Sequence, residues 1–429
     1  CCKQSNRILI ADHVDAREAR VVEDKKVDQN ESNEVQADPI KEERPVFQHT
    51  NIFLWLSCVF VGLTICAMFL FRSPQLAQAC INMKKCSKHL DPGSLVWGDW
   101  VIGNGLMDLK DPQWWFFRNS LPRLSAFAIA FVSLRHLAAK YCDEQSRKIS
   151  NMVLSTAFVA VLHGSGFFWL LCIMTVWYVA GQLTKGNSRL CAVTTIALTA
   201  GTLYLKYYGF DLLPFHKIAG AGYLDKLIPR MYRWDRIVGL FLLRLISFNL
   251  DAHWAYLARQ NGTEKELVRI PRASKATSVA YETAVVTHRP QADYTFLGLY
   301  GYCLYAPLWT AGPTITFNAF ASQITNPQKS FSKAYIALYA FRVLFIIAFM
   351  EVMLNFFVYF TLGHSNIYRH LKNVLSIISM VLVTLFLLWT KFTCIWRTAR
   401  LWALVDGIEV PENQTRCVYN CTSLATFWT

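Results

Sequence analysis

Tyr305-Ala-Pro-Leu-Trp-Thr-Ala-Gly-Pro-Thr-Ile-Thr-Phe-Asn318 is the stretch that decides the fold, and it lies in a segment without charged residues from Tyr294 to Gln328. About 20 apolar residues can cross a bilayer as a helix, so this segment is long enough. Pro307 and the pair Gly312-Pro313 nevertheless remove backbone donors and break helical geometry inside it. Irregular backbone is tolerated at membrane depth only where protein buries it or where it lines a polar cavity. The stretch therefore predicts a broken membrane helix in a protein that handles something inside the bilayer.

The composition of the whole chain also indicates an integral membrane protein. Of its 429 residues 54% are hydrophobic and only 17% are charged, whereas a soluble protein carries about 25% charged residues. The net charge of +14 is typical of loops that face anionic lipid headgroups, and no basic run has the folded context of a nucleic-acid-binding module. We therefore expect membrane lipids, and not nucleic acid, as partners.

The predicted organisation is a charged, disordered tail over residues 1–48, followed by a multi-span membrane domain over 49–429. The tail is poor in aromatic residues and has no hydrophobic periodicity. The remainder predicts an all-α bundle of about eight spans, several of them short or broken. The expected spans cover residues 51–71, 124–134, 149–184, 190–205, 237–250, 294–318, 334–362 and 373–390.

Three details of this pattern are less regular. Gly164-Ser-Gly166 divides the span at 149–184, which is either one long tilted helix or two short helices that meet at a turn. Arg123 and Arg135 bracket the short run 124–134, and we expect both arginines to snorkel toward water. Basic and apolar residues alternate over 225–236, which predicts a helix lying in the membrane interface.

Ionisable side chains inside membrane spans are functional candidates by default. His163 is the histidine that falls within a long uncharged run, so it is a candidate ligand-binding residue or base. The alternative is a hydrogen-bonded histidine that locks a helix contact beside the two glycines. The sequence leaves both interpretations open and favours the structural one.

Four charged residues lie in the later spans. Arg342 and Glu351 are nine residues apart, which is 2.5 helical turns, so we expect each to find its partner on another helix. Arg244 and Asp251 are seven residues apart and therefore lie on nearly one face. They are expected to brace the bundle, with the binding of a polar headgroup as the alternative.

Familiar catalytic and cofactor motifs are missing. The sequence has no Gly-x-Ser-x-Gly, no phosphate-binding GxxxxGK[ST] and no His-Glu-x-x-His. Its 13 cysteines form no CxxC pair and no Cys/His zinc spacing. The sequence therefore predicts no metal site and no bound cofactor.

Three segments together resemble a known family. They are Leu304-Tyr-Ala-Pro-Leu-Trp-Thr-Ala-Gly-Pro-Thr-Ile-Thr-Phe-Asn318, Arg244-Leu-Ile-Ser-Phe-Asn-Leu-Asp-Ala-His-Trp254 and Ile395-Trp-Arg-Thr-Ala-Arg-Leu-Trp-Ala-Leu-Val-Asp-Gly407. They are similar to the membrane-bound O-acyltransferase (MBOAT) superfamily, in the glycerol-uptake-protein branch that is related to Hedgehog acyltransferase. The resemblance runs from about residue 50 to the end of the chain.

This resemblance implies a many-helix fold in the endoplasmic reticulum membrane with a tunnel for a fatty acyl chain. It implies acyl transfer from acyl-CoA, as co-substrate, to a hydroxyl of a lipid or GPI-anchor acceptor. The tunnel lining carries over to five positions of the quoted stretch, and His163 joins them as a candidate substrate-binding residue. The five positions are Tyr305, Pro307, Trp309, Gly312 and Pro313.

The catalytic histidine of the family does not carry over. In the family it follows a Phe-Trp pair by some tens of residues, whereas here Phe427-Trp428 is followed only by Thr429. None of the ten histidines stands at the matching position, so we assign no catalytic residue and expect a chain that lacks the catalytic end. The alternatives are a membrane protein associated with glycerol or polyol transport, or a catalytically dead relative that binds lipid.

Overall fold

Helices account for nearly all of the backbone that the computed structural model describes. The described residues are 91–92, 96–97, 100–101, 106–141, 144–209, 231–262, 281–325, 327–328, 330–357, 359–364 and 374–412. The chain divides into two units, residues 1–70 and 71–429, and every described residue belongs to the second. The predicted tail at 1–48 and the predicted first span at 51–71 therefore lie outside the described residues.

The elements follow one another as helices of very different lengths. The long helices are α5 (Pro112–Tyr141), α6 (Glu144–His163), α7 (Gly166–Thr184), α8 (Ser188–Tyr204), α11 (Val238–Gln260), α15 (Lys333–Phe356) and α17 (Val374–Asp406). The short ones are the π-helix η2 (Leu205–Gly209), the 3₁₀ turns η4 (Trp234–Arg236), η5 (Gln291–Asp293) and η6 (Ala306–Leu308), and α12 (Tyr281–Val286), α13 (Phe296–Cys303), α14 (Phe317–Thr325) and α16 (Tyr359–His364). Two antiparallel pairs of two-residue strands precede them: β1 (Asp91–Pro92) with β4 (Leu106–Met107), and β2 (Val96–Trp97) with β3 (Trp100–Val101).

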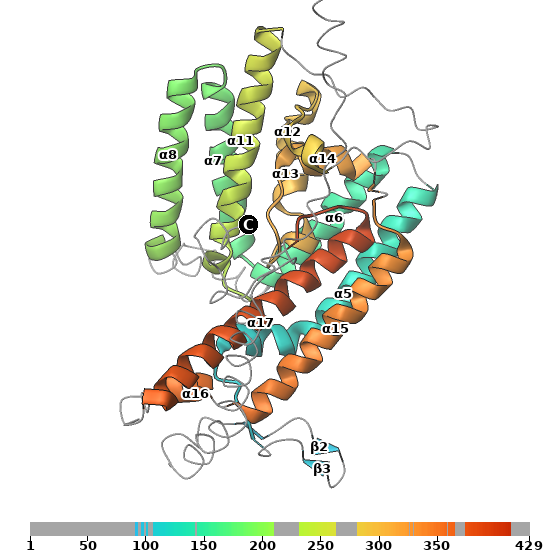
Figure 1. Ribbon diagram of the computed structural model, residues 1–429. Coiled ribbons are helices and arrows are strands. Elements are labelled where there is room, and N and C mark those ends of the chain that lie inside the picture. The colour runs from blue at the N-terminus through green and yellow to red at the C-terminus, as the bar shows by residue number, and fades with distance from the viewer. Residues whose placement is uncertain are drawn as a thin grey trace, which may run out of the picture. The chain divides into compact units, whose positions relative to one another are not determined.

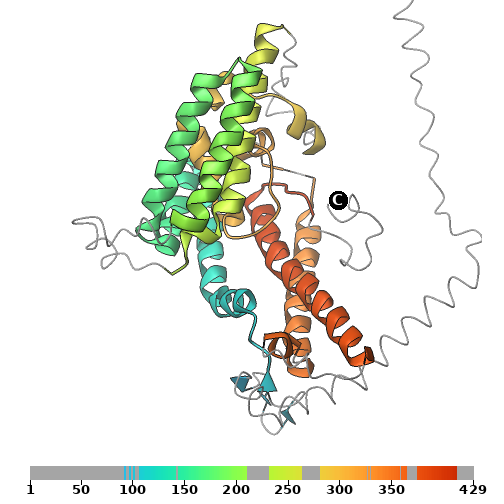
Figure 2. The same cartoon turned by 90° about the vertical axis from the view of Figure 1, so that its left-hand side faces the viewer.

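One group of helices is formed by α7, α8 and α11, which lie side by side (Figures 1 and 2). The predicted span at 149–184 is two helices, α6 and α7, because the chain turns at Gly164 and Ser165. Gly164 has φ 57°, a left-handed conformation that glycine adopts without steric cost. Leu162 lies in the last turn of α6, and its carbonyl accepts the N–H groups of Met231 (3.1 Å) and Tyr232 (2.8 Å).

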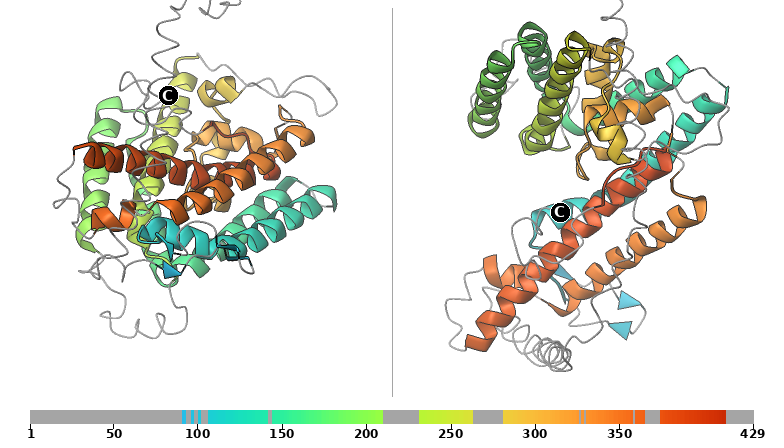
Figure 3. Two further views of the ribbon diagram at one scale, coloured as in Figure 1. Left: turned by 60° about the horizontal axis from the view of Figure 1, so that its bottom comes forward. Right: turned by 45° about the horizontal axis from the view of Figure 1, so that its top comes forward.

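A second group is formed by α5, α15 and α17, as Figures 1 and 3 show. The run predicted at 124–134 is the middle of the 30-residue helix α5. The span predicted at 373–390 is too short, because the helix continues without a break to Asp406. The expectation that Arg135 snorkels is wrong, because its side chain is only 8% exposed. The guanidinium does not reach water and pairs with the carboxylate of Asp406 on α17.

Four helices are long and apolar enough to cross a membrane, over residues 166–184, 188–208, 333–355 and 376–406, and 148–163 is a shorter apolar helix. The outer face of α15 presents large apolar side chains, among them Phe341, Leu344 and Phe345, each more than half exposed. Such a face is stable in contact with lipid and not with water. The protein is therefore an all-α, polytopic membrane protein, as the sequence predicted.

The helix predicted at 225–236 is only partly described. Its described end, from residue 231, is a turn followed by η4, in which Asp235 accepts hydrogen bonds from Arg233. Trp234 is buried against the start of α7. Residues 225–230 lie outside the described residues, so the interfacial placement stays a prediction.

Candidate functional site

The quoted stretch belongs to a broken segment, here defined as residues 296–325. It consists of α13, the 3₁₀ turn η6, an extended connection over 309–316 and α14. Residues 301–309 are all buried. The prediction of a broken helix that is buried in protein is therefore confirmed in the described residues.

Arg244, on α11, satisfies the carbonyl groups that the break leaves without a helical partner. Its Nη1 donates to the carbonyl of Cys303 at 2.8 Å, and its Nη2 donates to the carbonyl of Leu308. These carbonyls belong to the last residues of α13 and η6, where the backbone dipoles concentrate negative charge. A buried guanidinium, 4% exposed, therefore stabilises two carboxyl-terminal ends at once.

Asp251 lies two turns further along α11 and holds the opposite kind of helix end. Its Oδ2 accepts from the backbone N–H of Asn318 (3.3 Å) and from the Ser247 hydroxyl (3.3 Å). Ser247 Oγ in turn accepts from the N–H of Phe317 at 3.1 Å. A carboxylate beside the first N–H groups of α14 complements the positive end of that helix. One face of α11 thus carries a cation for the carbonyl ends and an anion for the amide end, which is the bracing role that the sequence favoured.

Gly312 allows the extended connection to pass close to α17. Its φ is 119°, which residues with a side chain rarely adopt. A Cβ atom placed there would lie 2.9 Å from the Cβ of Ala399 on α17. Glycine is therefore required at position 312 both by the backbone conformation and by the contact with the neighbouring helix.

Tyr305, Asp406 and Arg135 form a buried cluster that joins the broken segment to α17 and α5. The Tyr305 hydroxyl donates to Asp406 Oδ2 at 2.7 Å. Arg135 approaches the same carboxylate in two places, Nε to Oδ1 at 2.9 Å and Nη2 to Oδ2 at 3.2 Å. The Asp406 side chain is 1% exposed. Two-point contact of this kind is the strongest pairing that an arginine makes.

His163 contacts the broken segment through Trp309. Its Nε2 accepts the indole N–H of Trp309 at 2.8 Å, and its Nδ1 lies 3.1 Å from the Tyr232 carbonyl. These partners assign the proton to Nδ1, so both ring nitrogens are occupied. The geometry is that of the structural alternative, a histidine that locks the end of α6 to the quoted stretch.

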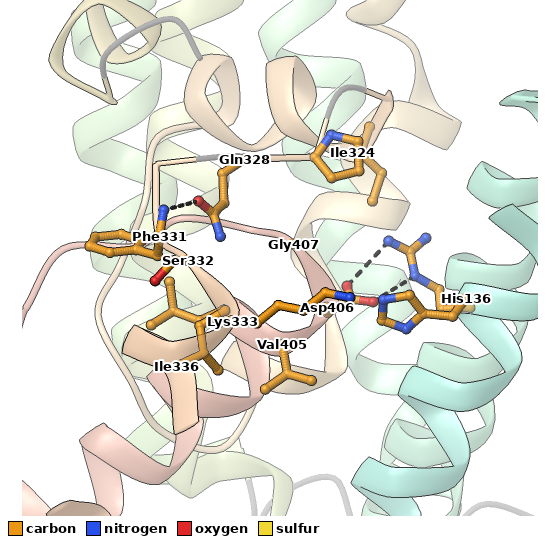
Figure 4. A pocket seen from close by; sticks show the side chains of 13 residues that line it. His136, Ile324, Gln328, Phe331, Ser332, Lys333, Ile336, Val405, Asp406 and Gly407 are labelled. Carbon is orange, nitrogen blue, oxygen red and sulfur yellow. Dashed lines mark hydrogen bonds and ion pairs between the residues drawn. The ribbon is translucent and has the colours of Figure 1, made fainter. Parts of the chain in front are cut away.

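A cavity of about 430 Å³ lies on the other side of Asp406, among α5, α15, α17 and the connection before α15. Figure 4 shows Lys333 extending from α15 toward His136 on α5, with Asp406 between the two helices. The walls of the cavity combine charged and polar side chains with apolar ones. The lining residues are Arg135, His136, Ile324, Pro327, Gln328, Phe331, Ser332, Lys333, Ile336, Leu404, Val405, Asp406 and Gly407.

The predicted site residues fall into two contacts and not into this cavity. Trp309 meets His163 and Tyr305 meets Asp406, while Pro307 and Gly312 are buried and Pro313 is half-buried. None of the six predicted residues lines the cavity. Neither Arg135 nor Asp406 is among the residues predicted from the sequence to bind substrate. The signal for them was present, because Arg135 follows an apolar run and Asp406 belongs to the third quoted segment.

Two further expectations concern charged and metal-binding residues. Glu351 pairs with Arg118 on α5 at 3.0 Å, which confirms that its partner lies on another helix and not at Arg342. Among the described residues, no group of three His, Cys, Asp or Glu side chains is arranged to hold a metal ion.

Comparison with known proteins assigns the family. Residues 221–429 match the family described as MBOAT, membrane-bound O-acyltransferase family. The chain is 30% identical over 358 residues to membrane-bound O-acyltransferase gup1 of Schizosaccharomyces pombe, covering 81% of this chain and 59% of the relative. It is 29% identical over 337 residues to membrane-bound O-acyltransferase GUP1 of Saccharomyces cerevisiae, covering 77% of this chain and 58% of the relative.

A paralogue in the same yeast, membrane-bound O-acyltransferase GUP2, is 27% identical over 351 residues, which cover 77% of this chain and 56% of the relative. The chain thus spans less than two thirds of the length of these relatives. The matched region contains the broken segment, the bracing residues Arg244 and Asp251, and Asp406. On these matches, the chain belongs to the membrane-bound O-acyltransferase superfamily, in the branch of the GUP proteins.

Proposed function

We propose that this protein is a membrane-embedded O-acyltransferase that moves a fatty acyl group from acyl-CoA to a hydroxyl of a lipid-type acceptor, such as a GPI-anchor lipid, in the endoplasmic reticulum. The observation that carries the proposal is the family match over residues 221–429. The names of the matched relatives, all membrane-bound O-acyltransferases, support the same reaction class. Both substrates partition into the bilayer, so a site among membrane helices suits them.

In this reaction the acceptor oxygen attacks the thioester carbonyl, the carbon–sulfur bond breaks, and the CoA thiol leaves. A base takes the proton of the hydroxyl. Exclusion of water matters because water would compete with the acceptor for the acyl group. We propose that the buried broken segment supplies an apolar wall for the acyl chain, through Tyr305, Pro307, Trp309, Gly312 and Pro313.

In this proposal His163 positions part of the acyl wall and does not take the proton of the acceptor hydroxyl. Both of its ring nitrogens have partners, Tyr232 and Trp309, so it would orient the indole that faces the chain. We assign no catalytic base among the described residues. His253 is likewise engaged, since its Nδ1 accepts the N–H of Gly186 at 3.1 Å and its Nε2 lies 3.3 Å from Ser188 Oγ.

The test is acyl transfer by the full-length protein. Microsomes from cells that express it, incubated with labelled acyl-CoA and a lysophospholipid, are expected to form the acylated product. Glycerol flux into liposomes without acyl transfer would instead support the transport alternative. Cofractionation with endoplasmic reticulum markers tests the compartment.

The acyl wall is tested by the choice of acyl chain. Trp309→Ala removes a large buried side chain and is expected to shift the preference toward longer acyl chains, because the space beside His163 grows. Trp115, which is 50% exposed, offers the matched control: Trp115→Ala should keep the wild-type preference. An unchanged chain-length profile in a folded Trp309→Ala protein would contradict the placement of the wall.

A further inference from the structure

The cavity beside Asp406 has no part in the acyl wall described above. It lies between α5 and the amino-terminal end of α15 (Figure 4), and the Arg135–Asp406 pair is part of its lining. The hydrogen bonds that its polar side chains already make determine which kind of ligand the cavity can bind.

Each side-chain oxygen of the lining already accepts at least one hydrogen bond. Both oxygens of Asp406 accept from Arg135, and Oδ2 also accepts from Tyr305. The Oε1 atom of Gln328 accepts the N–H of Phe331 at 3.1 Å. The Ser332 hydroxyl oxygen accepts the N–H of Tyr335 at 3.2 Å, as the cap of α15. A molecule that entered the cavity would therefore find few acceptors for its own donors.

Two donor groups of the lining, in contrast, have no partner among the described residues. The ammonium group of Lys333 makes no hydrogen bond or ion pair there, and neither does the amide nitrogen Nε2 of Gln328. His136 donates its Nδ1–H to the carbonyl of Val132 at 2.9 Å, so the Nε2 of the neutral ring carries no proton and adds no free donor. The lining thus favours a ligand that offers several acceptor oxygens.

The net charge of the lining favours the same kind of ligand. Arg135 and Asp406 cancel one another, so the ammonium of Lys333 leaves the cavity positive. The positive end of the α15 dipole adds to this charge, since α15 begins at Lys333. An anionic, acceptor-rich group such as a phosphate is complementary to both properties.

The level of the cavity in the membrane identifies the source of that phosphate. One candidate span begins at Lys333 and another ends at Asp406, and both of these residues line the cavity. The cavity therefore lies at the boundary of the hydrocarbon layer, where phospholipid headgroups are found. About two to three turns further along α15 from Lys333, the exposed side chains of Phe341 and Leu344 provide an apolar surface for acyl chains.

We propose that this cavity binds the phosphate of an anionic phospholipid from the surrounding bilayer, through the ammonium of Lys333 and the amide nitrogen of Gln328, with the acyl chains along the outer face of α15. The bound lipid is a partner of the fold and not the acyl acceptor. The site does not depend on the proposed reaction.

Lipid binding can be measured on the full-length protein in nanodiscs of phosphatidylcholine that contain a small fraction of phosphatidylglycerol. After extraction, native mass spectrometry counts the phosphatidylglycerol molecules that stay bound. Lys333→Gln is expected to weaken this retention about fivefold, the factor that one basic residue contributes near an anionic lipid surface. Gln328→Glu combined with Lys333→Gln should weaken it further, because the carboxylate still accepts the N–H of Phe331 but repels a phosphate. Lys333 is exposed and Gln328 is half-buried, so the variants are expected to fold.

Arg189→Gln is the matched control, because Arg189 is also an exposed basic residue in the first turn of a candidate span, α8, behind a side-chain cap, Asn187. It should retain phosphatidylglycerol like the wild type. Equal retention by Lys333→Gln and the wild type would overturn the proposal, and so would an equal loss in both variants. Displacement of the lipid by millimolar inorganic phosphate would show that the cavity takes a soluble anion, and would overturn its assignment to a lipid.

Discussion

The broken segment at 296–325 and helix α15 are both apolar enough for a membrane, yet they meet their backbone requirements in opposite ways. The broken segment contains no charged residue, but charged residues of α11 and α17 hold it. Helix α15 contains Arg342 and Glu351 and is nevertheless a regular helix with an exposed apolar face. A regular helix satisfies its own backbone, so its charges are free to serve other contacts. A broken one needs polar partners from its neighbours.

The largest effect is expected where the buried cluster joins the broken segment to α17. Asp406→Asn would leave the Arg135 guanidinium buried without its countercharge, which costs about 3–5 kcal/mol when one partner of a buried pair is lost. Thermal unfolding of the purified protein in detergent measures this. The double variant Arg135→Met/Asp406→Asn removes both charges, keeps an acceptor for the Tyr305 hydroxyl, and should recover most of the loss. Wild-type stability of Asp406→Asn would mean that the pair does not hold the segment.

A smaller loss is expected for Arg244→Met, which leaves the carbonyls of Cys303 and Leu308 without a donor. Each buried carbonyl left unsatisfied costs about 1–3 kcal/mol, and the removal of a buried charge offsets part of the sum, so a net loss of about 2–3 kcal/mol is expected. The same unfolding assay applies. Arg342→Met on α15 is the matched control and should change stability little, because Arg342 is exposed. Equal losses in the two variants would remove the contrast between the two regions.

Glycine substitutions in irregular and in regular backbone are expected to change the free energy of unfolding with opposite signs. Gly312→Ala is expected to destabilise the protein by about 1–2 kcal/mol, because alanine is strained at positive φ and its Cβ meets Ala399. Gly201→Ala, in the regular helix α8, should stabilise it by about 0.5–1 kcal/mol, since no atom lies within 4 Å of the new Cβ. Shifts of the same sign at both sites would contradict the assignment of strain to the broken segment.

The smallest effect concerns the loop before α5, outside the membrane spans. Burial raises the pKa of Asp108 above its ordinary value of 3.8, against the hydrogen bonds from Thr361 and Lys110 that lower it. A raised carboxyl pKa favours the protonated folded state, so its contribution to stability is full below about pH 4 and is lost as the pH rises through the folded pKa. Asp108→Asn should remove this decline, because the amide can accept from the N–H of Thr361 and donate to its hydroxyl. Unfolding curves from pH 4 to 7 would show an identical decline in both proteins if Asp108 had no part in it.

Several features of the fold could be predicted because they depend on local sequence. Pro307 and Gly312-Pro313 cannot continue a helix, so the break followed from the residues themselves. The spacing of Arg244 and Asp251 predicted a shared face, and the two side chains do act from one face of α11. The full length of α17 could not be predicted, because Lys391 and the arginines after it suggested that the membrane span had ended. Lys391 is buried and pairs with Asp111 at 2.6 Å, a partner 280 positions away in the chain.

The sequence by itself determined an all-α membrane protein, its superfamily, and a break in the apolar segment at 305–318, since apolar length and the chemistry of proline and glycine act locally. The tertiary structure decided which distant side chains complete that break. It placed Arg244 on the carbonyl ends, Asp251 on the amide end, and Arg135 and Tyr305 on Asp406. The physical reason is that an unsatisfied backbone group can be recognised in a sequence, whereas its donor or acceptor is chosen by the packing of whole helices.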